Sequence, residues 1–172
     1  DNVPSVGYRV PIGKASVVRE GSDLTIVAHS YMVIEAIRCA DALKINGISI
    51  EVVDLRSIRP LDTETILNSV TKTHRLLVAD NGWTFCGVSA EIISIVTENI
   101  FDELATAPQR VGLNDSPSPS TRALASGFYP TAKSIAKKTC EILNKTVDLD
   151  LLFPSSSSPE DVPDPHYFTG PF

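Results

Sequence analysis

Three short stretches of this chain contain side chains of the kinds that act in catalysis or ligand binding. His29-Ser30 follows one apolar run, Arg56 and Arg59 follow a second, and Cys86 follows a third. A histidine titrates near neutral pH and serves as a general base, while arginines hold anions. A cysteine just before a helix has a lowered pKa and is a candidate nucleophile. Each of these residues also has a purely structural interpretation, so their spacing must decide between the two.

The spacing matches no complete catalytic motif. The chain contains neither a GxGxxG fingerprint nor a P-loop, and GVSAE at Gly87 lacks the second glycine of a nucleophile elbow. No carboxylate partner for His29 is identifiable, which favours a capping or packing histidine, and Cys86 fits a small buried cysteine. His74 precedes an apolar run and is expected at the surface. We therefore assign no catalytic, cofactor-binding or metal-ligating residue.

The cysteines give no metal site either. Cys39, Cys86 and Cys140 are widely spaced and form no CxxC pair, which favours a reducing, intracellular compartment.

Two kinds of non-catalytic site remain open. Arg56 and Arg59 either hold an anion or pair with Asp54, Asp62 or a partner chain, and the second interpretation is preferred. The candidate anion site comprises Ser30, Arg59 and Gly82. The candidate interface residues are aromatic and lie in a glycine-containing loop or at the end of a polar tail: Trp83, Phe85, Tyr167, Phe168 and Phe172.

The elements that position these residues alternate between strands and helices. Short β-branched runs at 24–28, 48–55, 76–79 and 108–113 are typical of strands buried on both faces. Apolar residues at helical spacing predict helices over 30–43, 62–72, 88–104 and 131–144, with 80–87 as a loop. This order predicts an α/β fold: a three-layer α/β/α sandwich around a five-stranded, mainly parallel sheet. Residues 14–19 are expected to add one short antiparallel edge strand.

Local signals fix several helix ends. Asp62 is expected to cap the helix that follows it, with Leu61 and Ile66 forming a hydrophobic staple. Ser30 is a plausible N-cap for the helix before it, which Asn46-Gly47 then ends.

Composition excludes several classes of protein. Hydrophobic residues make up 42% of the 172 residues, enough to form a hydrophobic core. The net charge of −6 gives no indication of nucleic-acid binding. No apolar run approaches the roughly 20 residues of a membrane span. We expect an extended segment over 1–13, one domain over 14–145, and a Ser/Pro-rich tail over 146–172. A chain that begins with Asp1 suggests a fragment, a processed product or a trimmed polypeptide.

A family resemblance emerges from these stretches taken together. The chain contains PIGKA from residue 11, DLRSIRPLD from residue 54, SVTKTHRLLVADNGW from residue 69 and GVSAEI from residue 87. In this order they resemble the C-terminal domain of the beta subunit of thiamine-dependent 2-oxo acid dehydrogenases, pyruvate dehydrogenase most of all. The resemblance covers roughly residues 8–144. The combination of these motifs is specific to the family, whereas any one motif alone would be weak evidence.

The resemblance implies a non-catalytic domain of a larger enzyme. In this family, thiamine diphosphate and magnesium are held by the N-terminal domain of the beta subunit and by the alpha subunit, and lipoamide is the acceptor. The resemblance therefore implies that this fragment alone binds no cofactor and is inactive. The implied partners are an alpha subunit, a second beta subunit and the subunit-binding domain of the lipoyl acyltransferase, with no nucleic acid and no membrane. The implied location is the cytoplasm, or the mitochondrial matrix in a eukaryote.

Alternatives remain within and outside this family. The stretch PSPSTRALASGFYPTA from residue 117 departs from the common mitochondrial pyruvate pattern. The same domain type occurs in branched-chain 2-oxo acid and acetoin dehydrogenases, and it closes transketolases and deoxyxylulose-phosphate synthases. A hypothesis of a different class is a stand-alone anion-binding α/β module.

Overall fold

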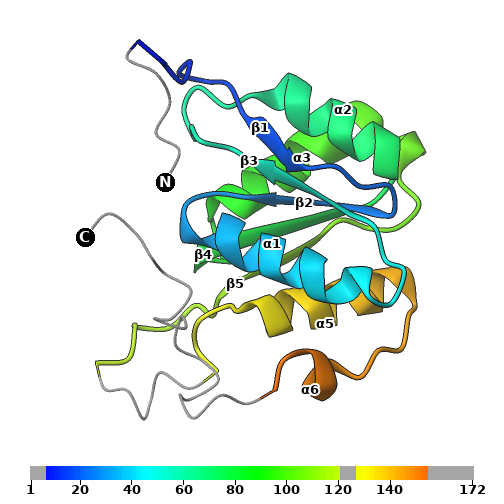
Figure 1. Ribbon diagram of the computed structural model, residues 1–172. Helices are drawn as coiled ribbons and strands as arrows, with labels where there is room; N and C mark the ends of the chain where they lie inside the picture. Colours follow the sequence, from blue (N-terminus) through cyan, green and yellow to red (C-terminus); the bar gives the residue numbers. More distant parts are fainter. Residues whose placement is uncertain (1–6, 121–126, 155–172) are drawn as a thin grey trace.

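The computed structural model describes residues 7–120 and 127–154 (Figure 1). The candidate interface residues Tyr167, Phe168 and Phe172 lie outside these ranges. The strands are β1 Ser16–Arg19, β2 Leu24–Ala28, β3 Ile50–Asp54, β4 Leu76–Trp83 and β5 Gln109–Leu113. The helices are α1 Tyr31–Lys44, α2 Thr63–Thr73, α3 Val88–Ile100, the 3₁₀ turn η1 Phe101–Glu103, α5 Ala132–Leu143 and α6 Leu149–Leu152.

The sheet has five strands in the order β1-β3-β2-β4-β5. All neighbouring pairs are parallel except β1 with β3, so β1 is a short antiparallel edge strand. Helices α1 and α5 cover one face of the sheet, and α2 and α3 cover the other (Figure 1). The predicted three-layer α/β/α sandwich and its edge strand are confirmed.

Side chains of the central strands serve two cores in alternation. On β2, Leu24, Ile26 and Ala28 face α1 and α5, while Val27 faces α2 and α3. All five residues of β2 are buried, because parallel strands covered by helices on both faces have no solvated side. This explains why the strand sequences are continuous apolar runs and do not alternate.

Two predicted boundaries were wrong. Strand β4 continues through Asp80 to Trp83, where a loop was expected, because Trp83 pairs with Leu113 of β5 beyond an irregularity in the register. Helix α3 ends at Ile100, and the 3₁₀ turn η1 replaces the predicted last turn. Glycine and proline signals in the sequence did not reveal that β5 would hold the extension of β4 in the sheet.

Asp62 joins the edge strand to the second helix. Its carboxylate accepts hydrogen bonds from the backbone N–H of Thr65 at 3.3 Å and from that of Ala15, just before β1, at 3.0 Å. The predicted N-cap is therefore confirmed, and it also anchors a segment 47 residues away in sequence. Leu61 packs against the same core cluster as Ile66, as expected for a staple.

A buried glutamate performs a similar role on the opposite face. Glu35 on α1 is only 2% exposed, and its carboxylate accepts the backbone N–H of Ala132, the first residue of α5, at 2.6 Å. Arg38 donates to the same carboxylate at 2.8 Å and Tyr31 at 3.0 Å.

Ser30 occupies the N-cap position of α1, as predicted, but its side chain makes no capping hydrogen bond.

A polar cluster is buried under α2 at the amino end of the sheet. Glu51 on β3 is 1% exposed and contacts the Ser69 hydroxyl and the Lys72 ammonium group. The hydroxyl of Thr25 on β2 is hydrogen-bonded to the Ser69 hydroxyl at 3.0 Å and to the Thr73 hydroxyl at 2.7 Å. A buried charge is tolerated when it is paired and hydrogen-bonded, which this cluster achieves.

The chain after α5 adds to the core. Val147, Leu149, Leu152 and Phe153 pack against the cluster beneath α1 and α5. Residues 147–153 lie within the range assigned to the tail from the sequence, and 155–172 lie outside the described residues. The boundary between domain and tail therefore stays a prediction.

We expect Asp62→Ala to lower the free energy of unfolding by about 2 kcal/mol, because a helix cap and the bond to Ala15 are lost together. Urea denaturation of the purified chain measures this value. Asp115→Ala, an exposed aspartate in a bend, is the matched control and is expected to change little. Equal stabilities of the two variants would show that Asp62 does not tie β1 to α2.

Candidate functional site

The carboxyl ends of three neighbouring strands meet at one edge of the sheet. From β2 the chain crosses to β3 on one side, and from β3 it crosses back to β4 on the other side of β2. In open α/β sheets the crevice at such a reversal is the preferred position for a ligand. His29 follows β2, Arg56 follows β3, and Asp80 lies within β4. The topology thus brings the sequence-predicted polar residues to a single edge.

His29 and Asp80 form a hydrogen-bonded pair at this reversal point. The His29 Nε2 atom lies 3.1 Å from Asp80 Oδ1, and the side chain of Asp80 is only 4% exposed. The backbone N–H of Gly82 donates to the same oxygen at 2.8 Å, and the backbone N–H of Ser89 in the first turn of α3 also donates to this carboxylate. Asp80 therefore ties together the end of β2, the extension of β4 and the start of α3.

The interaction between His29 and Asp80 shifts the pKa of each side chain in the direction expected for an ion pair. The hydrogen bond from Asp80 raises the pKa of His29, partial burial opposes this, and the charges of Asp80 and Asp54 add to it. Burial opposes ionisation of Asp80, but the hydrogen bonds from His29, Gly82 and Ser89 outweigh it and lower the pKa of Asp80. The expectation that His29 has no carboxylate partner was therefore wrong. In the sequence both residues directly follow predicted strands, but only the sheet order makes those strands neighbours.

Glycines around Asp80 allow the backbone to approach closely. A Cβ on Gly82 would lie 3.2 Å from Asp80 Oδ1, and one on Gly87 would lie 2.1 Å from the Trp83 carbonyl oxygen. Between them, Cys86 adopts φ +52° and is exposed, which corrects the expectation of a buried cysteine. A left-handed residue between the extended strand and α3 turns the side chain outward. All three cysteines are free thiols.

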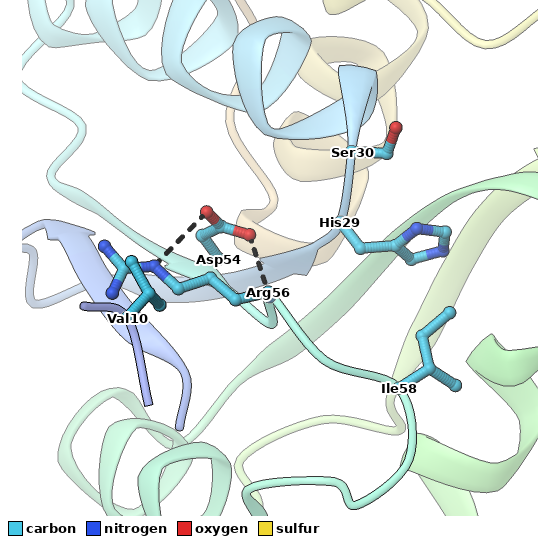
Figure 2. Close-up of a pocket in the computed structure, with 6 residues that line it drawn as sticks. All are labelled: Val10, His29, Ser30, Asp54, Arg56 and Ile58. Atoms are coloured by element: carbon cyan, nitrogen blue, oxygen red, sulfur yellow. Dashed lines mark hydrogen bonds and ion pairs between the residues drawn. The ribbon is translucent and has the colours of Figure 1, made fainter. Parts of the chain in front are cut away.

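A pocket of about 450 Å³ opens beside His29 (Figure 2). Its lining residues are Val10, His29, Ser30, Asp54, Arg56 and Ile58. Arg56 pairs with Asp54, since its Nε lies 3.8 Å from Asp54 Oδ2 and its backbone N–H donates to Oδ1 at 3.1 Å. The preferred structural interpretation of Arg56 is thus confirmed. In Figure 2 the Arg56 side chain and the His29 ring extend in opposite directions.

Only one of the three predicted anion-site residues lines this pocket. Ser30 lines the pocket, whereas Arg59 and Gly82 are not among its lining residues. Gly82 is part of β4, and Arg59 is exposed on the loop after β3. His74 is exposed, as predicted, and its Nδ1 lies 2.9 Å from the Glu103 carbonyl oxygen.

The two candidate interface residues within the described ranges are both exposed. Trp83 is 53% exposed and Phe85 is 67% exposed, at the end of β4 and just beyond it. Large aromatic side chains left open to water at one place are typical of contact surfaces. Both remain predictions as interface residues.

The chemistry available at this edge is limited. Asp80 orients the His29 ring and favours its protonated form, as a carboxylate does in a catalytic triad. Within 7–120 and 127–154, no serine, threonine or cysteine side chain is hydrogen-bonded to that ring. The same residues contain no group of three or more His, Cys, Asp or Glu side chains that could hold a metal ion.

No helix in the described ranges is long and apolar enough to cross a membrane.

Comparison with known proteins shows which family this chain resembles. The family model "Transketolase, C-terminal domain" matches residues 13–135. The chain is 43% identical over 148 residues to the Drosophila melanogaster protein "Pyruvate dehydrogenase E1 component subunit beta, mitochondrial", covering 86% of this chain and 40% of the relative. It is 41% identical over 142 residues to the beta subunit from Rickettsia felis, covering 81% of this chain and 44% of that protein. The chain thus spans less than half the length of these curated relatives.

A solved structure supports the same fold. The chain superposes with a TM-score of 0.71 on a protein described as "Split gene transketolase, inactive beta4 tetramer", at 29% identity. The superposition covers 84% of this chain and 46% of that one. The α/β/α architecture is therefore shared with a transketolase subunit.

We expect the stabilising effect of His29 to depend on pH. Its pKa is raised above 6.5 in the folded chain, so its contribution is fully present below pH 6.5 and is lost as pH rises through the raised value. Asp80 stays ionised over this range because its pKa is lowered from 3.8. His29→Gln keeps an N–H donor without titrating, so below pH 6.5 the wild type is expected to be more stable by about 1–2 kcal/mol.

Denaturation of both proteins between pH 5 and pH 9 measures this difference. His74→Gln, which removes an exposed histidine, is the control and is expected to follow the wild-type profile. Parallel pH profiles for the wild type and His29→Gln would contradict a charged His29–Asp80 pair.

Proposed function

The chain belongs to the transketolase C-terminal domain family, and we propose that it forms the C-terminal domain of the beta subunit of a pyruvate dehydrogenase. The observation that carries this proposal is 43% identity to such a subunit over 86% of the chain. The proposed role is assembly of the subunits and docking to the lipoyl acyltransferase core. We assign no catalytic residue to the chain.

The proposed whole enzyme decarboxylates pyruvate and passes the acetyl group to lipoamide. Thiamine diphosphate and magnesium would be bound by other parts of that enzyme. The proposed partners are an alpha subunit, a second beta subunit and the subunit-binding domain of the acyltransferase. The proposed location is the mitochondrial matrix in a eukaryote and the cytoplasm in a bacterium.

The proposed unit of assembly is the domain over residues 14–145, preceded by the segment 1–13 and followed by 146–172. Trp83 and Phe85 are the proposed contact residues on it, because they are exposed beside a rigid strand end. The hydrogen bonds to Asp80 hold this strand end in place, so the two aromatic side chains need little ordering when a partner binds.

A second candidate is the corresponding domain of a transketolase, which the 29% identical structural neighbour favours. Domains of branched-chain 2-oxo acid and acetoin dehydrogenases, and of deoxyxylulose-phosphate synthases, are further alternatives of the same type. A stand-alone anion-binding module at Ser30, Arg59 and Gly82 is a weaker alternative, since only Ser30 lines the pocket. Calorimetric titration of the chain with inorganic phosphate tests that module.

We expect the complete beta subunit that contains this chain, co-expressed with its alpha subunit, to act on pyruvate in preference to other 2-oxo acids. Reduction of an artificial electron acceptor with pyruvate, branched-chain 2-oxo acids and ketose phosphates as substrates measures this preference. Activity on ketose phosphates alone would assign the chain to a transketolase. Preference for a branched substrate would correct the 2-oxo acid and leave the family unchanged.

We also expect Trp83→Ala with Phe85→Ala to weaken assembly with the alpha subunit by about 30-fold, the effect of losing roughly 2 kcal/mol at an interface hot spot. Sedimentation of the co-expressed subunits measures the loss. Phe101→Ala is the matched control, because Phe101 is also 67% exposed but follows the far end of α3. Equal assembly of all variants would remove Trp83 and Phe85 from the interface.

A further inference from the structure

The pocket beside His29 has an apolar rim that is open to solvent. Val10 and Ile58 both line this pocket of about 450 Å³, and they are 46% and 47% exposed (Figure 2). Val10 precedes β1 and Ile58 follows β3, and the two segments are in contact, because a Cβ on Gly13 would lie 2.6 Å from Pro60. The volume is within the range of about 300–1,000 Å³ for small-molecule pockets, so one aromatic side chain fits inside.

Positive charge accompanies this rim on both segments. Each segment carries an exposed arginine next to its apolar side chain, Arg9 on the first and Arg59 on the second. Neither arginine has an ion-pair partner among the residues that the structure describes. Residues 7–13 and 55–61 contain no carboxylate, although the whole chain has a net charge of −6. We call the two apolar side chains and the two arginines the pocket surface.

A complementary surface lies at the end of helix α3. Phe101 is 67% exposed at the start of η1. Three exposed carboxylates flank it in sequence: Glu98, Asp102 and Glu103. None of the three has an ion-pair partner within residues 7–120 and 127–154, and residues 76–109 contain no lysine or arginine. We call Phe101 and these three carboxylates the acidic surface.

Other exposed apolar side chains lack this combination. Leu151 on α6 is also close in sequence to two aspartates, but Asp150 is paired with Lys133 at 2.9 Å, and Asp148 accepts backbone N–H groups of its own helix. The exposed aromatic side chains at the end of β4 have one acid close in sequence, Asp80, and its carboxylate is buried. In the described part of the chain, the end of α3 is thus the place where an exposed aromatic side chain lies among unpaired acids.

Helix α3 separates the two surfaces within one molecule. It has 13 residues and is about 20 Å long. It begins beside Asp80 at the carboxyl end of the sheet, where the pocket lies. It ends at the amino end of the sheet, where the backbone N–H of Ala105 donates to the His74 carbonyl oxygen just before β4. The sheet fixes these two ends relative to each other, so the two surfaces can meet only between different molecules.

We propose that copies of this chain associate head to tail, with Phe101 of one copy in the His29 pocket of the next. The carboxylates of the acidic surface then lie beside the arginines of the pocket surface, and opposite charges meet across the contact. A twofold contact through the pocket surface alone would place arginines against arginines. A contact between two different surfaces repeats from copy to copy and gives rings or open chains. This inference goes beyond the proposed function, because no alpha subunit takes part.

We expect Arg9→Glu with Arg59→Glu, and separately Asp102→Lys with Glu103→Lys, to weaken self-association about tenfold or more, because each pair places like charges in the contact. Phe101→Ala is expected to weaken it about 30-fold, through loss of the apolar contact. Sedimentation of the full chain alone, over increasing protein concentration, measures these effects. The wild-type oligomers are expected to grow beyond dimers.

Lys44→Glu with Ile45→Ser is the matched control. This pair is also basic and apolar, and both side chains are exposed, but they lie at the end of α1 on the other face of the sheet. The control is expected to associate like the wild type. Circular dichroism confirms that every variant is folded.

A mixture of the two charge-reversed variants gives the decisive comparison. The unchanged acidic surface of one variant meets the unchanged pocket surface of the other, and the two reversed surfaces also carry opposite charges. We expect the mixture to associate although neither variant does so alone, which would support the contact. A mixture that stays monomeric overturns the proposal, as does a monomeric wild type or a dimer that both variants retain. The measurement uses neither an alpha subunit nor a 2-oxo acid, so this proposal and the proposed function can fail separately.

Discussion

The hydrogen bonds to the Asp80 carboxylate are the constraint on which the functional edge of this domain depends. One nearly buried side chain accepts from His29 at the end of β2, from Gly82 in the extension of β4 and from Ser89 at the start of α3. A buried carboxylate without these donors would carry a large desolvation penalty, so the three segments are held at fixed positions around it. Gly82 and Gly87 permit the close approach, because a Cβ at either position would crowd Asp80 or the Trp83 carbonyl.

The same principle recurs at the other junctions of the fold. Asp62 fixes the edge strand to α2, Glu35 fixes α5 to α1, and Glu51 lies in the polar cluster beneath α2. Each carboxylate accepts a hydrogen bond from a backbone N–H group of a segment distant in sequence. Helices on both faces supply most of the hydrophobic burial, but these polar contacts select which helix end meets which strand.

These features suit the proposed role of the domain in subunit assembly. The His29–Asp80 pair lies at the position where related architectures place ligands, yet it serves to hold a strand and a helix start together. Its neighbours are exposed apolar side chains and arginines. Family membership, similarity to beta subunits of pyruvate dehydrogenase and this rigid, exposed edge are consistent with a domain that meets other polypeptides.

The sequence by itself determined the strand and helix order, the three-layer fold, the cap at Asp62 and the family. Continuous β-branched runs and helical periodicity are local signals, so strands and helices can be predicted from them without tertiary information. Only the tertiary structure decided that Asp80 is the partner of His29, that Glu35 binds the start of α5 97 residues away, and that Cys86 is exposed. It also decided that β4 extends to Trp83. Each of these depends on which strand ends become neighbours, and that order follows from packing of the whole sheet and not from any one segment.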